Sequence, residues 1–369
     1  MKKLLLSIFA VAALVGCSKA DITYDNQLQE IGFTPYSKKS VKSAVTTTDY
    51  PNTLNMYVFA QAGAPGETDL SKFTEPYFRN AEFNDKSVNP SAEVDESNGI
   101  FSGTAQPYYW PNVKRLIFSG VSASGNVNNG ATPDYAKNSN NAWEITLEKY
   151  APGTGTAELG DNDLMWFPTT ASYSKDEIVG TEKPGHVDVT MKHACSWITI
   201  NMKGDEITGA ENTTWKIKSL SINGLSLSGD VVLGKNADWD NLSSASDEPF
   251  TVFNGSKVLT KTATPFENIS NNTIVIPQTP TTLTIVYEFV SQKGGASDGK
   301  DIIIEETKTV DLTLADTVIG KDDQGNDIKG DNWLPGVHYT YNITIGTSEI
   351  LIDPAVLNWS EQTVTGIVM

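Results

Sequence analysis

Apolar and polar residues alternate along much of the chain. In Val337–Ile345 every odd-numbered position is apolar or aromatic, and every even-numbered position is polar. A period of two residues is typical of a β-strand with one buried face, because successive side chains point to opposite faces of a sheet. The same alternation recurs in Leu54–Ala60, Trp143–Leu147, Leu283–Phe289 and Val310–Leu314. We therefore expect a strand in each of these segments.

Clusters of Gly, Asn, Asp and Ser separate the alternating segments, as in Ser124–Gly130 and Lys321–Asp327. Such clusters are typical of turns between strands. No long segment shows the 3.6-residue period of an amphipathic helix, so the pattern predicts an all-β chain. A chain of 369 residues with 39% hydrophobic content exceeds one typical core. We therefore expect two consecutive β-sandwich domains.

The alternation changes phase at Lys192–His193, since apolar residues fall on odd positions before this point and on even positions after it. A β-bulge or a break there would restore a consistent face. The stretch Lys175–Gly185 just before is polar and rich in turn formers. We therefore place the domain boundary near residue 185, with one sandwich at 46–185 and the other at 186–348.

The first residues have the layout of a secretory signal peptide. Lys2 and Lys3 precede the apolar run Leu4–Val15, which is too short to span a bilayer comfortably. Leu14–Cys17 resembles a bacterial lipobox, in which the cysteine accepts a diacylglyceryl group and becomes the first residue after cleavage. This resemblance implies a signal peptide at 1–16 and a lipid anchor in the outer membrane. An ordinary export signal with an incidental cysteine is the alternative.

Cysteine content and charge narrow the function classes. Lipidation of Cys17 leaves Cys195 alone, so stability must come from packing rather than from a disulfide. The chain has 27 basic and 45 acidic residues and a net charge of −18, which loss of Lys2 and Lys3 would take to −20. Such a surface repels nucleic acid and anionic lipid. We therefore expect no nucleic-acid partner.

Motifs for catalysis or for metal binding are weak. None of His186, His193 and His338 is spaced with another ligand in a zinc pattern, and His338 falls on the polar side of its strand, where we expect it to be solvated. Gly224–Gly229 misses the nucleophile elbow by one residue. Gly153–Gly155 lacks the third glycine of a dinucleotide site. We therefore expect a non-enzymatic protein with no cofactor, metal or catalytic residue.

Two alternatives remain open at this point. The acidic stretch Asp322–Asp331 does not follow the ligand order of a calcium loop, so we interpret it as a hairpin turn, with a weak ion site as the alternative. A carboxylate pair for glycoside cleavage has no recognisable spacing among 45 acidic residues. A surface hydrolase is therefore unsupported rather than excluded.

Four segments together resemble the fimbrillin family of Bacteroides-type bacteria, whose members are subunits of type V pili. They are similar to the family's YYWP and LxF stretch, its KHA strand, its IPQ and LxI element, and its WxPGxxYxYxI signature. The segments are Tyr108–Ser119, Val187–Ile200, Ile276–Ile285 and Trp333–Tyr341. They stand in the family's order, although Trp197 occupies a position where a lysine is common. The resemblance implies two transthyretin-like β-sandwiches and a role in a fimbrium.

Most residues of these motifs are expected to serve folding. Trp110 and Trp333 are then core aromatics, and Pro111 and Pro335 are turn formers. Gly336 is then a backbone-permissive entry to the last alternating strand. Function must therefore be sought at the two ends of the chain.

The resemblance implies that a protease removes the first strand and that a donor strand from a neighbouring subunit fills the groove. Ile31–Tyr36 resembles this removable strand, with Ile31 and Phe33 directed inward, in a lipidated segment at 17–45. Pairing of an added strand with a free sheet edge is the physical basis of such an exchange.

A polar loop follows the removable strand and offers protease sites. Lys39 and Lys42 are the expected positions for a trypsin-like maturation protease, because exposed polar loops are where proteases cut. The best-known family members are cut after arginine, and this chain has no arginine before Arg79. An uncut subunit that stays lipidated as an anchor is therefore an alternative, as is a plain solvated loop.

The segment 349–369 is the expected donor strand. It is apolar and rich in β-branched residues, and it follows the best alternating strand of the chain. We expect the inserted side chains to be Ile350, Ile352, Val356, Leu357 and Trp359. The alternative is a final strand that stays in its own sheet.

The leading hypothesis is a pilus shaft subunit at the cell surface, tethered to the outer membrane until it is processed. Its partners are then other pilin subunits and the maturation protease. Alternatives are a tip or anchor pilin, or a lipoprotein that binds host or bacterial surface glycans or proteins. In the last case Tyr108, Tyr109 or Trp166 would be sugar platforms, and an exposed coplanar set would favour binding.

Overall fold

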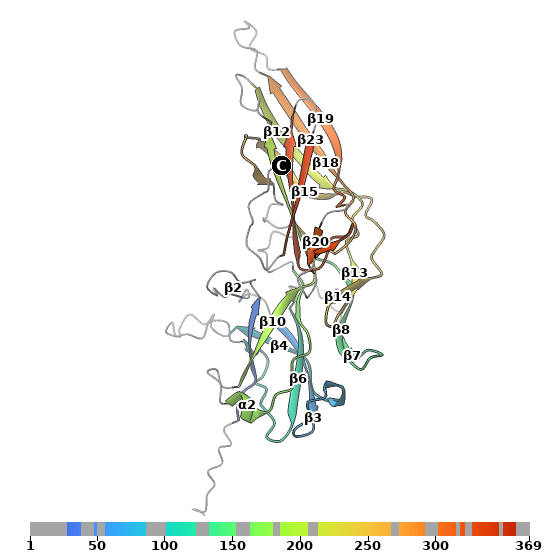
Figure 1. Ribbon diagram of the computed structural model, residues 1–369. Coiled ribbons are helices and arrows are strands. Elements are labelled where there is room, and N and C mark those ends of the chain that lie inside the picture. The colour runs from blue at the N-terminus through green and yellow to red at the C-terminus, as the bar shows by residue number, and fades with distance from the viewer. Residues whose placement is uncertain are drawn as a thin grey trace, which may run out of the picture.

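The computed structural model describes residues 28–37, 48–49, 56–85, 101–122, 133–152, 163–179, 185–205, 213–266, 273–291, 302–314, 318–321, 327–346 and 350–358. Within these ranges the chain is almost entirely β, which confirms the predicted all-β class. Helical structure in them is limited to a 3-10 turn at Leu70–Lys72 and to α2 at Lys175–Val179. None of the described helices is long and apolar enough to cross a membrane. Figure 1 shows an elongated molecule.

The largest sheet follows the order β10-β9-β6-β3-β4-β5-β1-β2. Its strands are β1 (Gly32–Ser37), β2 (Thr48–Asp49), β3 (Met56–Gly63), β4 (Glu75–Asp85), β5 (Phe101–Gly103), β6 (Arg115–Ser122), β9 (Met165–Phe167) and β10 (His186–His193). Strand β1 also pairs with β10, so the sheet closes on itself into a ring. Closure of a sheet pairs the backbone edges that an open sheet would leave exposed. A core cluster that includes Ile31, Phe33 and Phe118 belongs to this ring.

A smaller sheet combines strands from two distant parts of the chain. Its order is β14-β13-β8-β7. The strands are β7 (Asp134–Lys137), β8 (Trp143–Tyr150), β13 (Gly229–Leu233) and β14 (Ala237–Asp240). Because β8 and β13 pair, this sheet joins segments from both sides of residue 185. The domain limits 46–185 and 186–348 therefore remain a prediction.

Two further sheets enclose the second large core. One has the order β16-β11-β22-β23, with β17 also paired to β11, and the other has the order β15-β12-β18-β19. The strands are β11 (Ser196–Gly204), β12 (Thr213–Ile222), β15 (Phe250–Val258), β16 (Thr264–Phe266), β17 (Thr273–Val275), β18 (Thr282–Ser291), β19 (Ile302–Asp311), β22 (Val337–Ile345) and β23 (Ile350–Asn358). A separate hairpin pairs β20 (Val318–Lys321) with β21 (Asp327–Lys329).

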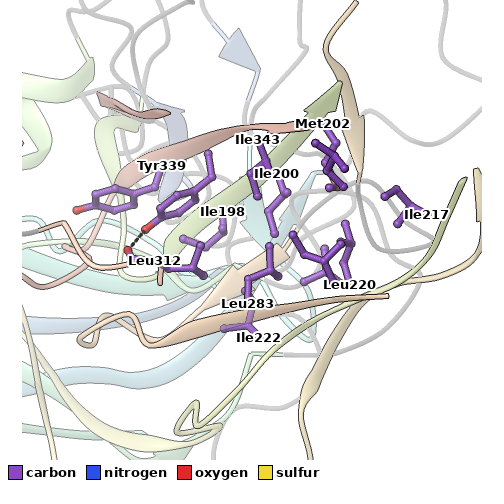
Figure 2. Packing of buried hydrophobic residues seen from close by; sticks show 14 of the residues in the cluster. Ile198, Ile200, Met202, Ile217, Leu220, Ile222, Leu283, Leu312, Tyr339 and Ile343 are labelled. Carbon is purple, nitrogen blue, oxygen red and sulfur yellow. Dashed lines mark hydrogen bonds between the residues drawn. The ribbon is translucent and has the colours of Figure 1, made fainter. Parts of the chain in front are cut away.

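Side chains from both of these sheets meet in one apolar cluster (Figure 2). Ile198 and Ile200 of β11 belong to this cluster together with Ile222 of β12 and Leu283 of β18. Strand β22 alternates between buried and half-buried residues at all nine positions, as its sequence predicts. Burial of apolar surface contributes roughly 25 cal/mol per Å², so this alternation fixes which face of the strand points inward.

The phase change near residue 193 is a break between two strands. Strand β10 places Val187, Val189 and Met191 in the core of the ring, and β11 places Ile198 and Ile200 in the other large core. The connecting residues Ala194 and Cys195 are buried in a third cluster. The chain therefore crosses from one sheet to another here, which is the predicted break rather than a bulge within one strand.

The motif aromatics serve folding, as expected. Trp110 and Trp333 are 3% and 1% exposed. The Trp333 indole donates a hydrogen bond to the Tyr341 hydroxyl at 2.9 Å, and that hydroxyl donates to the Leu312 carbonyl at 3.0 Å. Gly336 has a φ of +68°, a conformation that side-chain-bearing residues rarely adopt.

Candidate functional site

Part of the predicted site lies outside the described residues. This applies to the lipidation residue Cys17, to the protease sites Lys39 and Lys42, and to Trp359 of the expected donor. The removable strand and residues 350–358 of the expected donor segment are described, and they occupy different sheets.

Strand β1 is held on both sides. It pairs in parallel with β10 at all six of its residues. On its other side Gly32 and Phe33 pair in antiparallel fashion with β5. A parallel neighbour from residue 186 onward could not be predicted from local sequence, because the two segments are far apart in the chain.

The residues just before β1 continue the pairing. The Ile31 amide donates to the Tyr108 carbonyl at 2.7 Å, and the Trp110 amide donates to the Gln29 carbonyl at 2.9 Å. The Gly185 carbonyl accepts from the Gly32 amide at 3.1 Å and from the Trp110 indole at 2.9 Å. The YYWP motif therefore forms part of the seat of the first strand.

Ile31 and Phe33 both point into the core of the ring, as predicted, and neither is exposed. The Phe33 ring lies edge-on to Phe83 at 4.9 Å and to Phe118 at 5.2 Å between centroids, with Phe167 at 6.0 Å. Such aromatic pairs add roughly 0.5–1.5 kcal/mol each beyond the area that they bury. Phe33 is thus the main side-chain anchor of β1.

The expected donor strand lies in its own chain in this structure. Strand β23 pairs in antiparallel fashion with β22 at all nine positions, so that Ile352 is opposite Ile343 and Val356 is opposite Tyr339. It is the last strand in the order of its sheet. The arrangement matches the alternative of a strand that stays in its own sheet, and a donor role for 349–369 remains a proposal.

The proposed sugar platforms do not form an exposed coplanar set. Trp166 is 3% exposed, and its indole donates to the Gly234 carbonyl at 3.1 Å. Tyr108 is half-buried and packs on Phe78 and Phe83, with centroids 4.6 Å and 5.7 Å away. The expectation that Trp166 could serve as a platform is therefore wrong, because this side chain is part of the core.

A contact between a buried carboxylate and a half-buried histidine was missed by sequence reasoning. Asp163 is 1% exposed, and its carboxylate contacts the Nδ1 atom of His193. Burial raises the pKa of Asp163, and His193 offsets part of that rise. Burial, and then the charge of Asp163, raise the pKa of the Cys195 thiol well above its usual value. No spacing rule joins residues 163 and 193, because Asp163 lies just before β9 and His193 ends β10.

This cluster lies where several segments meet. The Ala194 amide donates to the Leu164 carbonyl, and the Ala194 carbonyl accepts from the Trp239 indole at 2.8 Å. The Gly336 amide donates to the Cys195 carbonyl at 2.8 Å. Within the described part of the chain, no three His, Cys, Asp or Glu residues are arranged to hold a metal ion. Asp163 and His193 therefore lie at a junction between several segments of the fold, with Asp163 buried and His193 half-buried.

His338 is half-buried beneath another side chain, in contrast to the expectation of a solvated histidine on the polar side of its strand. Its ring stacks on Trp197 with centroids 3.7 Å apart, and its Nε2 atom lies 2.8 Å from the Thr199 hydroxyl. Burial lowers the pKa of His338 to about 4. The alternation correctly predicted the face of the strand, but the neighbouring strand β11 covers that face with an aromatic ring.

The chain resembles known fimbrial proteins in sequence pattern and in fold. A family model described as fimbrillin-like matches residues 28–359. The structure of a fimbrial protein from Bacteroides vulgatus is 16% identical and has a TM-score of 0.60, with 89% of this chain and 99% of that chain covered. No curated protein matches the chain.

Two other solved structures are more distant. A putative cell adhesion protein from Bacteroides ovatus is 13% identical, with a TM-score of 0.47 and with 90% of this chain and 99% of that chain covered. The fimbrial anchor protein Mfa2 from Porphyromonas gingivalis is 10% identical, with a TM-score of 0.32 and with 89% and 97% covered. At such identities the Bacteroides vulgatus structure speaks for the fold alone.

Proposed function

The chain belongs to the fimbrillin-like family, and from this membership we propose that it is a structural, non-enzymatic subunit of a type V pilus. In this proposal the protein is exported as a lipoprotein through Cys17 and is displayed on the outer membrane. A trypsin-like protease cuts after Lys39 or Lys42, and subunits then polymerise by donor-strand exchange.

The position of β1 is the observation that carries the proposal. A strand that closes a ring leaves two unpaired edges when it is removed, one on β10 and one on β5. It also leaves an apolar cavity where Ile31 and Phe33 were fully buried. Unpaired edges beside an apolar cavity favour insertion of another strand, because that strand gains both backbone pairing and side-chain burial.

The segment 349–369 is the donor in this proposal. Its described part, β23, has a strand neighbour on one side only in the sheet order, so fewer strand pairings hold it than hold β1. A strand at a sheet edge, or the residues that follow it, can pair with another subunit at lower cost than an internal strand. The donor would therefore come from one sheet and the acceptor groove would lie in another.

An anchor subunit is the second candidate, and a sequence observation favours it. The chain has no arginine before Arg79, although the best-known relatives are cut after arginine. An uncut chain would keep β1 in place, and its ring would accept no donor. It would then end a pilus at the lipid-anchored side.

Replacement of both Lys39 and Lys42 by alanine tests the two candidates. In a shaft subunit the double variant stays at full mass at the cell surface and fails to form SDS-resistant ladders on unheated gels. Lys203→Ala, in exposed surface of β11, is the matched control and should ladder normally. A wild-type surface form that mass spectrometry finds intact from Cys17 onward would favour the anchor instead.

Deletion of 359–369 tests the donor separately. The truncated chain keeps all of β23, so we expect a folded monomer that no longer ladders. Ladders from the truncated chain would show that the donor lies elsewhere.

A further inference from the structure

The seat of β1 has one position at which a side chain does not fit. Gly32 is buried and is paired in register with His186, the first residue of β10. A Cβ atom on Gly32 would lie 1.9 Å from Cδ2 and 2.5 Å from Nε2 of His186. Both distances are far below van der Waals contact, so the half-buried His186 imidazole would have to move before a side chain could occupy this position.

The two flanking positions have the opposite requirement. Ile31 and Phe33 are fully buried in the core of the ring, and Phe33 lies among three phenylalanine rings. Successive residues of a strand point to opposite faces, so Gly32 faces His186 while its neighbours face the core. The seat therefore favours three consecutive residues: an apolar one, a glycine, and a large apolar one.

The segment 350–369 contains a single glycine, Gly366. With Gly366 in the place of Gly32, and with the same strand direction as β1, Ile367 takes the Phe33 position and Thr365 takes the Ile31 position. The Thr365 hydroxyl is buried in either direction and needs a hydrogen-bond partner there. The direction of β1 places the larger apolar side chain, Ile367, among the three phenylalanine rings around the Phe33 position. No side chain in 363–369 is charged, as suits an apolar seat.

We propose that His186 is a specificity residue that admits only a strand with glycine opposite its ring, and that 363–369 of a second copy of this chain is the strand that it admits. This inference rests on the proposed function, because it assumes that β1 is replaced by a strand from another subunit. The imidazole then rejects strands that carry a side chain at this position.

The first test uses the intact chain and needs no strand exchange. Gly32→Ala should lower the melting temperature by several degrees, because overpacking a core is destabilising. His186→Ala alone should have a smaller effect, and the double variant should regain most of the loss caused by Gly32→Ala. If Gly32→Ala lowers the melting temperature equally with and without the His186 imidazole, the proposed role of His186 is wrong.

The second test identifies the strand. A specific protease site is inserted between Ser37 and Thr48, the chain is cut, and fluorescent peptides 28–37 and 350–369 are added. Both should bind, and their Gly32→Ala and Gly366→Ala forms should bind about tenfold more weakly or worse. His186→Ala in the cut chain should reduce the difference in affinity between each peptide and its alanine form.

The outcomes distinguish the glycine requirement at His186 from the assignment of the donor strand. If peptide 28–37 shows the glycine requirement and peptide 350–369 does not bind, the His186 rule holds and the assignment of the donor is wrong. If both alanine peptides bind like their parents, the His186 rule is wrong even if the chain polymerises through 349–369. If neither peptide binds, β1 is not a replaceable strand. The melting temperatures of the intact-chain variants then still decide whether the His186 imidazole requires glycine at position 32.

Discussion

The first and last described strands of the chain occupy opposite kinds of position. Strand β1 lies between β10 and β5 and closes a ring, whereas β23 is the last strand of its sheet beside β22. Strand β1 is short, with six residues, and its anchor Phe33 is fully buried. Strand β23 has nine residues, all paired with a single neighbour.

This difference supports the proposed assignment of donor and acceptor. Loss of an internal strand opens two edges and a cavity, so the vacated place gains much from a replacement. Loss of an edge strand opens one edge. In the proposed exchange the closed sheet of β1 is therefore the better acceptor, and the C-terminal segment that follows β22 is the better donor.

The largest effect should come from the anchor of β1. Phe33→Ala removes a fully buried ring that contacts three other rings, so we expect a loss of about 3–5 kcal/mol in the free energy of unfolding. Leu28→Ala is the control, because Leu28 is 72% exposed just before the same strand. Urea unfolding of both variants measures the difference. A loss below about 1 kcal/mol for Phe33→Ala would show that the ring core does not depend on β1.

The second-largest effect should be a loss of stability at low pH that arises from His338 in the sheet of β22. The pKa of His338 falls from 6.5 to about 4 because burial disfavours the charged imidazolium. The folded state therefore holds this group neutral, so its contribution to stability is complete above pH 6.5 and is lost as pH falls toward 4. The shift corresponds to a contribution on the order of 3 kcal/mol.

His338→Gln isolates this contribution, since glutamine can still hydrogen-bond to Thr199. The variant should lose less stability than the wild type between pH 6.5 and 4, measured as the melting temperature at each pH. Parallel curves for the two proteins would mean that Trp197 does not keep His338 neutral.

Much of this architecture could be predicted from local sequence. The alternation in Val337–Ile345 gave the correct inward face at every position, because a strand with one buried face must follow a period of two. The inward direction of Ile31 and Phe33 followed from the same rule. Trp110 and Trp333 could be assigned to the core because large aromatics dominate burial.

Long-range pairing could not be predicted in the same way. Strand β8 pairs with β13, and β1 pairs with β10, across long separations in the sequence. Alternation states which face is apolar, but it does not state which strand lies alongside. The contact between Asp163 and His193 depends on such neighbours. The stacking of Trp197 on His338 does as well.

The smallest effect should come from a single hydrogen bond at the seat of β1. The Gly185 carbonyl accepts from both the Gly32 amide and the Trp110 indole. Trp110→Phe removes the indole donor but leaves the amide in place, so the carbonyl stays paired. The direct loss from this hydrogen bond should therefore be only about 1 kcal/mol, with some further loss from the smaller ring.

The matched control is Trp333→Phe, which removes an indole donor at the other large core and leaves the Tyr341 hydroxyl bonded to the Leu312 carbonyl. The two variants should unfold with similar global losses. They should differ in amide hydrogen exchange at Gly32, because local opening of β1 is easier when the neighbouring YYWP segment is less firmly held. We expect faster exchange at Gly32 in Trp110→Phe and wild-type exchange there in Trp333→Phe. The same rate in both variants would mean that β1 opens only when the whole ring unfolds, and a protease cut alone would then not release it.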